Sequence, residues 1–186
     1  MAPAEHRPPW LAPPANVLPG VVPVELVIAR TEDTAVAVTG IRAYPTGFAF
    51  TVSIRLRRPL HQEQTHSGHG ILAMLDYFQP TGQVGDSFLR LGVRFADGRK
   101  ATNLHGFDLP RGRRRPKPPV LSEAGGGGGG ECDWDSHQWL WGLPPPGPLA
   151  FVCEWPARHI AELQVQIDAR LILDAAKRAV IFWPDD

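Results

Sequence analysis

The segment Gly47-Phe-Ala-Phe-Thr-Val-Ser-Ile-Arg-Leu-Arg57 alternates large apolar side chains with small or polar ones. Its large apolar members are Phe48, Phe50, Val52, Ile54 and Leu56. A period of two directs alternate side chains to opposite faces of a β-strand. We therefore expect this strand to bury one face in the core and to turn the other toward water.

Strand-like sequence continues on both sides of this segment. The ranges are 22–30, 35–44, 88–95, 99–104, 137–143, 149–155 and 162–168. The apolar phase of 35–44 shifts across Thr39 and Gly40, which predicts a β-bulge there. Ala96-Asp97-Gly98 predicts a hairpin turn. Helical periodicity over 169–179 predicts one short helix, and 180–183 is expected to be extended.

The order of these elements favours a mainly β fold. No βαβ alternation is visible, which argues against a parallel sheet. A two-sheet antiparallel β-sandwich, immunoglobulin-like or jelly-roll-like, with one short C-terminal helix, would bury this many one-sided strands. We expect residues 21–186 to form a single domain, with irregular loops near 59–86 and 105–135. The proline-rich residues 1–20 are expected to form an extended arm, anchored by Trp10 and Leu11.

Composition excludes few classes of protein. The 186 residues contain 19 Lys and Arg and 19 Asp and Glu, so the net charge gives no reason to expect binding to nucleic acid. No apolar run approaches the roughly 20 residues of a membrane span, and the first residues lack the apolar segment of a signal peptide. We expect a cytoplasmic protein. Cys132 and Cys153 are expected to be unpaired thiols, one in a loop and one on a strand, with a single bridge as the alternative.

The candidate binding surface follows a run of six glycines, Gly125 to Gly130. Its candidate residues are Asp133, Trp134, Asp135, Trp139 and Trp141. We expect Trp134 to stand exposed in a loop, because exposed tryptophan is enriched where proteins meet. Trp139 and Trp141 share one strand face and are expected to pack in the core, with an aromatic platform as the alternative. The acidic residues are expected to form a solvated turn, because the remaining features of a calcium loop are absent.

A basic segment precedes the glycines. It contains Arg111, Arg113, Arg114, Arg115 and Lys117. We expect a surface loop, and the alternatives are contact with an acidic partner, with nucleic acid, or with the acidic segment of the same chain.

No motif of the sequence indicates catalysis. His61, His66 and His69 could bind zinc or copper, but no further ligand pattern completes a site. GxxxxGK[ST], GxSxG and HExxH are absent. We therefore expect no metal, no cofactor and no enzymatic activity.

Three functional hypotheses remain. The first is a non-catalytic module that binds a protein partner or itself. The second is a small-ligand or carbohydrate-binding β protein that uses Trp134. The third is a metal-dependent enzyme built on the histidine loop.

The segment Leu143-Pro-Pro-Pro-Gly-Pro-Leu-Ala-Phe-Val-Cys-Glu-Trp-Pro156, with the glycine run and Trp139-Leu-Trp141, resembles a family of small uncharacterised actinobacterial proteins. The resemblance covers most of the chain beyond residue 20. It implies an actinobacterial source, in keeping with a composition rich in Ala and Arg and poor in Lys. It implies no activity, cofactor or site residue.

Overall fold

Strands make up most of the computed structural model, which describes residues 7–58, 84–104, 115–124 and 128–183. The described strands are β1 (Val17–Leu18), β2 (Gly20–Val21), β3 (Leu26–Arg30), β4 (Thr34–Tyr44), β5 (Gly47–Leu56), β6 (Arg90–Arg94), β7 (Lys100–Thr102), β8 (Val120–Glu123), β9 (Gly128–Gly129), β10 (Asp133–Trp141), β11 (Pro148–Trp155), β12 (Ile160–Asp168) and β13 (Val180–Ile181). One α-helix, α2 (Arg170–Lys177), lies between β12 and β13, and a 3-10 turn (Pro156–Arg158) joins β11 to β12.

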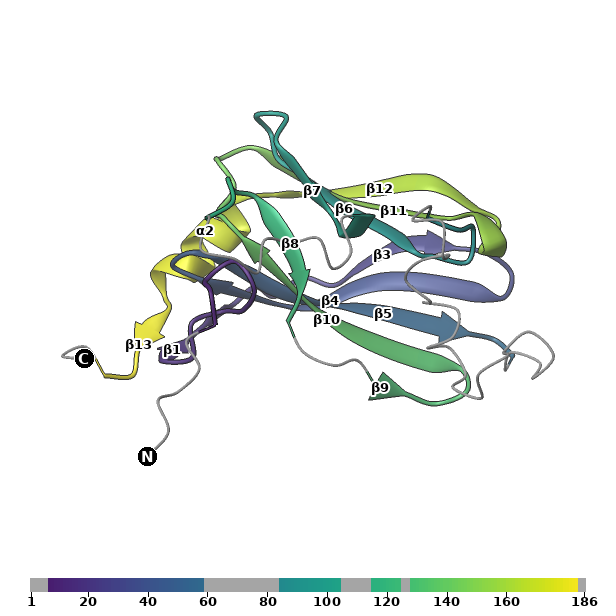
Figure 1. The fold of residues 1–186 in the computed structure, drawn as a ribbon, viewed down its shortest axis with the longest axis horizontal. Helices are drawn as coiled ribbons and strands as arrows, with labels where there is room; N and C mark the ends of the chain where they lie inside the picture. The colour runs from purple at the N-terminus through teal and green to yellow at the C-terminus, as the bar shows by residue number, and fades with distance from the viewer. Residues whose placement is uncertain (1–6, 59–83, 105–114, 125–127, 184–186) are drawn as a thin grey trace.

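Two antiparallel sheets pack face to face (Figure 1). The larger sheet has the order β2-β4-β5-β10-β8, with β3 also paired to β4 and β9 to β10. The smaller sheet has the order β12-β11-β6-β7. β1 and β13 form a separate two-stranded ribbon beside α2. The predicted antiparallel β-sandwich with one short helix near its C-terminal end is confirmed.

The main core lies between the two sheets, and β5 contributes one side of it. All five alternating apolar residues of the Gly47–Leu56 strand are buried, as the sequence predicts. The rings of Phe48 and Phe50 contact Phe151 of β11, with ring centroids 6.3 and 5.2 Å apart. These edge-on contacts join the sheets and add to the burial of apolar area.

The local breaks in the pattern also occur where the sequence predicts them. The register between β4 and β5 shifts between Thr39 and Arg42. Gly40, inside this bulge, has a φ of 58°, a conformation that glycine adopts without steric cost. β6 and β7 pair as a hairpin around Ala96-Asp97-Gly98, with the Phe95 N–H donating to the Arg99 carbonyl at 2.8 Å.

A second apolar cluster, the arm core, lies on the outer face of the larger sheet. It contains Trp10, Val17, Tyr44, Val120, Trp139 and Trp141. The Trp139 Nε1–H donates to the Pro9 carbonyl at 2.9 Å, and the Ser122 hydroxyl donates to the Trp10 carbonyl at 3.1 Å. Trp10 is buried and Leu11 packs beside it, so the predicted anchoring of the arm is confirmed.

Three parts of the loop expected near 105–135 are strands, and β9 (Gly128–Gly129) is one of them. Residues 120–123 form β8, and β10 begins at Asp133 rather than near His137. The partners lie far away in the sequence: β8 pairs with residues 138–141, and Asp133 pairs with Arg55. The pairing with β5 gives the acidic residues Asp133 and Asp135 a regular strand backbone, which their local sequence does not predict.

The remaining expectations concern the helix and the cysteines. α2 buries Ile172, Ala175 and Ala176 and confirms the helix expected near 169–179. Cys132 is partly buried, Cys153 is buried on β11, and both are free thiols, as expected. None of the helices in the described part of the chain combines the length and apolarity needed to cross a bilayer.

Candidate functional site

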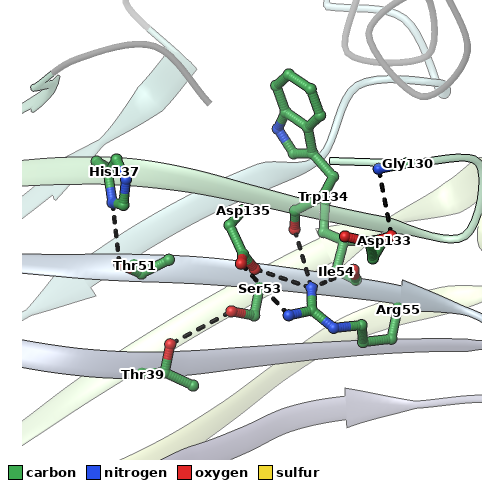
Figure 2. Close-up of polar contacts among 10 residues, drawn as sticks. All are labelled: Thr39, Thr51, Ser53, Ile54, Arg55, Gly130, Asp133, Trp134, Asp135 and His137. Carbon is green, nitrogen blue, oxygen red and sulfur yellow. Dashed lines mark hydrogen bonds and ion pairs between the residues drawn. The ribbon is translucent and has the colours of Figure 1, made fainter. Parts of the chain in front are cut away.

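A strip of polar side chains crosses the outer face of β4, β5 and β10 (Figure 2). This polar strip contains Thr39, Thr51, Ser53, Arg55, Asp133, Asp135 and His137. The pairing of β10 with β5 sets Asp135 opposite Ser53 and His137 opposite Thr51. Because alternate residues of a strand share a face, these side chains gather on the side of the sheet away from the main core.

An ion pair joins two strands of the polar strip. Arg55 Nη1 lies 2.8 Å from Asp135 Oδ1, and Nη2 lies 3.4 Å from Oδ2. Arg55 Nη1 also donates to the carbonyls of Ile54 and Trp134, at 2.9 and 3.4 Å. The hydrogen bond from Arg55 lowers the pKa of Asp135 and outweighs the opposing effect of burial. Asp135 is therefore a carboxylate at neutral pH.

The hydroxyl groups of the polar strip are also paired. Thr51 Oγ1 lies 3.1 Å from His137 Nδ1, and Thr39 Oγ1 lies 3.3 Å from Ser53 Oγ. Within the described part of the chain, no carboxylate contacts the second imidazole nitrogen of His137. Among the described residues, the hydroxyl–imidazole pair therefore has no third group of the kind that orients the base in a nucleophilic triad. A molecule bound to the polar strip would therefore meet hydroxyl groups, an imidazole and the ion pair between Arg55 and Asp135.

Trp134 is buried, so the prediction that its ring stands exposed is wrong. Only 6% of the residue is accessible. Because β10 begins at Asp133, Trp134 lies within the strand, opposite Ile54, and faces the main core. The even-numbered residues of β10 face inward, whereas the odd-numbered residues face outward.

The indole of Trp134 has an unusual environment. Its Nε1–H makes no hydrogen bond with any described residue. It lies beside a cavity of about 30 Å³ between the sheets, lined also by Asn103, Ser136 and Gln138. Gln138 Nε2 donates to Ser136 Oγ at 2.8 Å. A volume of this size accommodates about one or two water molecules rather than an organic ligand.

Trp139 and Trp141 are buried, which confirms their expected packing in a core. Their partners are in the arm core: Tyr44 lies edge-on to Trp139 at 5.5 Å, and Trp10 contacts Trp141 at 6.1 Å between centroids. Both rings are therefore covered by the chain itself. The alternative of an exposed aromatic platform is wrong for these two residues.

The acidic residues do not form the expected turn. Asp133 and Asp135 lie on β10, and their carboxylates project from the outer face of the sheet. Asp133 Oδ1 accepts a hydrogen bond from the Gly130 N–H at 3.2 Å, while Asp135 binds Arg55. The pairing of β10 with β5 fixes their positions.

Only part of the basic segment lies within the described residues. Arg111, Arg113 and Arg114 lie outside them. The Arg115 guanidinium lies 4.8 Å from the centroid of the Trp141 ring, and Lys117 is exposed. The predicted contact with the acidic segment is therefore not made by Arg115 or Lys117. Arg115 instead caps the arm core through a cation–π contact.

The histidine hypothesis falls on His61, His66 and His69, which lie outside the described residues. Across the ranges that the structure does describe, no three His, Cys, Asp or Glu side chains gather as metal ligands.

An exposed apolar surface is the feature that the sequence did not indicate. This apolar ribbon consists of Leu18 on β1 and Val180, Ile181, Phe182 and Trp183 on and after β13. Each of these residues is about half exposed, and Trp183 reaches 61%. The rings of Phe182 and Trp183 contact each other, with centroids 5.7 Å apart. The sequence Val180-Ile-Phe-Trp183 predicts an extended segment. It does not predict that both faces of this segment are exposed to water.

No protein-family model, curated protein or solved structure matches this chain significantly. The resemblance to actinobacterial proteins therefore stays a prediction.

Proposed function

We propose that the protein is a non-catalytic interaction module that associates with a second copy of itself through the apolar ribbon. The observation that carries this proposal is the exposure of β13 on both faces. Val180 and Ile181 point to opposite sides of the strand, and their exposed fractions are 55% and 49%. Contiguous exposed apolar side chains on a soluble protein mark contact surfaces.

The chemistry of the ribbon favours a second copy as its partner. Within the described residues β13 pairs only with β1, so its other edge has free N–H and C=O groups. Residues 179–183 carry no charge. If β13 of one copy paired antiparallel with β13 of a second copy, apolar side chains would lie opposite apolar side chains. A two-fold interface requires such a self-complementary surface, because both copies contribute the same residues. The zero net charge of the chain adds no repulsion between copies.

The aromatic residues also support a protein interface. Trp183 is large, exposed and adjacent to Phe182, and tryptophan is enriched among the residues that dominate binding energy. The carbohydrate hypothesis depends on an exposed Trp134, and the burial of that ring removes its surface. The histidine-based enzyme hypothesis gains no support from the described residues.

Sedimentation equilibrium of the whole chain over a wide concentration range tests the proposal. We expect a reversible monomer–dimer equilibrium. The substitution Trp183→Ser or Phe182→Ser is expected to weaken the dimer by at least about tenfold, because each removes an exposed ring that the dimer buries. The matched control is Leu163→Ser. Leu163 is also an exposed apolar residue, with 44% of its surface accessible, but it lies on β12 of the smaller sheet and not on the ribbon. It is expected to leave the equilibrium unchanged.

Either of two results would overturn the proposal. One is a monomer at every concentration reached. The other is a dimer that Leu163→Ser weakens as much as Trp183→Ser does, which would place the contact elsewhere. Because the substituted residues are exposed, circular dichroism and thermal unfolding of each variant should match the parent protein.

A further inference from the structure

A groove crosses the outer face of the smaller sheet, which is the face turned away from the main core. Its volume is about 240 Å³, and β6, β7, β11 and β12 contribute to its lining. Strand pairing sets Val152, Gly92 and Thr102 side by side across its middle. These three positions make a floor of small, largely apolar groups.

The missing side chain of Gly92 leaves a hollow in this floor. The backbone conformation at this position does not require a glycine. Gly92 is absent from the glycines with positive φ. A Cβ built there would lie 3.6 Å from the Ala101 carbonyl oxygen and from Thr102 Cγ2, and 3.8 Å from Val152 Cβ, all ordinary contacts. Glycine within a strand costs about 0.5–1 kcal/mol relative to alanine. The chain therefore keeps an open space where a side chain would fit and would stabilise the strand.

Two cations lie at one end of the groove. Arg94 of β6 and Lys100 of β7 are directly opposite each other in the strand register and share a face. Like charges in this position destabilise a sheet. Neither side chain pairs with a carboxylate among the described residues; Arg94 Nη2 donates instead to the neutral Gln164 Oε1, at 2.6 Å.

The other end of the groove has a different electrostatic character. There Arg90 pairs with Glu154 at 2.7 Å and with Asp86 at 3.8 Å, and Glu162 adds a further carboxylate. An anion would thus be attracted to the Arg94 end and repelled from the Glu162 end. This polarity gives a bound molecule one preferred orientation.

We propose that the groove binds a small organic anion with an oxyanion head and a short apolar tail. Arg94 and Lys100 hold the head through charge-assisted hydrogen bonds, which are the strongest kind available to an exposed site. The tail lies over Gly92 and between Val152 and Thr102. Carboxylate and phosphate monoester heads share this chemistry. This site is independent of the apolar ribbon, which belongs to a different pair of strands.

NMR titration of the ¹⁵N-labelled protein tests the groove. The probes are butyrate and butyl phosphate, with acetate and inorganic phosphate as heads that lack the tail. We expect saturable amide shifts centred on Gly92, Lys100, Thr102 and Val152. The tailed probes should bind at least about threefold more tightly than the matching bare heads, because the tail buries apolar area on the floor. Comparison of the two head types identifies the preferred anion.

Substitutions at three positions of the groove separate the parts of the proposal. Arg94→Gln and Lys100→Gln are each expected to weaken butyrate binding by at least about fivefold, as the loss of a charge-assisted hydrogen bond requires. Arg57→Gln is the matched control, because it removes an exposed cation outside the groove. Gly92→Leu is expected to abolish binding by filling the floor. Gly92→Ala should weaken binding while keeping or raising the thermal midpoint, which separates a blocked groove from a misfolded chain.

Several results would overturn the proposal. Shifts scattered over all basic surfaces, or a loss with Arg57→Gln equal to that with Lys100→Gln, would indicate nonspecific attraction of anions. Equal affinity for butyrate and acetate would remove the role of the floor. Retained binding in a folded Gly92→Leu variant, or no saturable shift with any probe, would also contradict it.

Discussion

The ion pair between Arg55 and Asp135 is the strongest electrostatic feature of the polar strip. Its side chains are 51% and 39% exposed, so solvent screens the attraction. We predict that a double-mutant cycle of Arg55→Gln and Asp135→Asn gives a coupling free energy of about 0.5 kcal/mol at neutral pH, in the range of exposed pairs. Urea unfolding of the four proteins measures it.

The pH dependence of this coupling has a definite sign. The pKa of Asp135 is lowered in the folded protein by its hydrogen bond from Arg55. Its contribution to stability is therefore fully present above the unfolded value of about 3.9 and is lost as the pH falls through the folded value. The coupling should vanish at a pH below both values. A coupling that persists in acid would show that Asp135 acts through packing rather than charge.

Cys153 makes a second prediction at the scale of one residue. Burial raises the pKa of its thiol to about 11. At pH 8 roughly one thiol in a thousand is then ionised, and the thiolate is the reactive form. We predict that iodoacetamide labels Cys132 in the folded protein and reaches Cys153 only after unfolding.

Mass spectrometry of the labelled protein, with Cys132→Ser as the control, measures this difference. The control should take up no label until denaturant is added. Equal labelling rates at both cysteines in the native protein would contradict the burial of Cys153.

At the scale of elements, the arm is part of the folded structure. Trp10 is buried against Trp141, and the arm contributes backbone carbonyls to Trp139 and Ser122. We predict that Trp10→Ala lowers the free energy of unfolding by about 3 kcal/mol, as deletion of a buried aromatic ring does. Leu18→Ala removes an apolar side chain that is 51% exposed on the same arm, and should cost much less. Equal losses would mean that the arm core adds little to stability.

β5 and β10 show which elements the sequence predicts and which it does not. The alternation of β5 is local, so its strand, its buried face and the bulge of the neighbouring β4 follow from the residues themselves. The first third of β10 follows glycines and carries two carboxylates, features that locally favour a loop. Its strand conformation comes from pairing with residues about 80 positions earlier, and that long-range contact places Trp134 inside.

The candidate surfaces were less predictable than the fold, for a related reason. Trp139 and Trp141 were expected in a core, but that core depends on the arm, some 130 residues earlier in the sequence. The polar residues of β5 were expected to face water, and only the register with β10 shows which of them meet Asp135 and His137. Gly92 and the exposed ribbon become visible only when the strands are assembled into sheets.

At the scale of the whole molecule, the two proposed contacts lie on different sheets and depend on different forces. The apolar ribbon would bury uncharged side chains, and burial of apolar area is insensitive to screening. The groove would attract its ligand through Arg94 and Lys100, which lie on the solvent-exposed face of the sheet. Dissolved ions screen such exposed charges over about 8 Å at physiological ionic strength.

Salt should therefore move the two equilibria in opposite directions. We predict that raising sodium sulfate strengthens dimerisation through the ribbon, because excluded salts favour apolar burial. The same series in sodium chloride should weaken butyrate binding by at least about threefold, because it screens the cations. Sedimentation equilibrium and NMR titration measure the two effects on the same protein. Dimerisation that weakens with salt would assign the contact to charged residues such as those of the polar strip, and the apolar ribbon would then not be the interface.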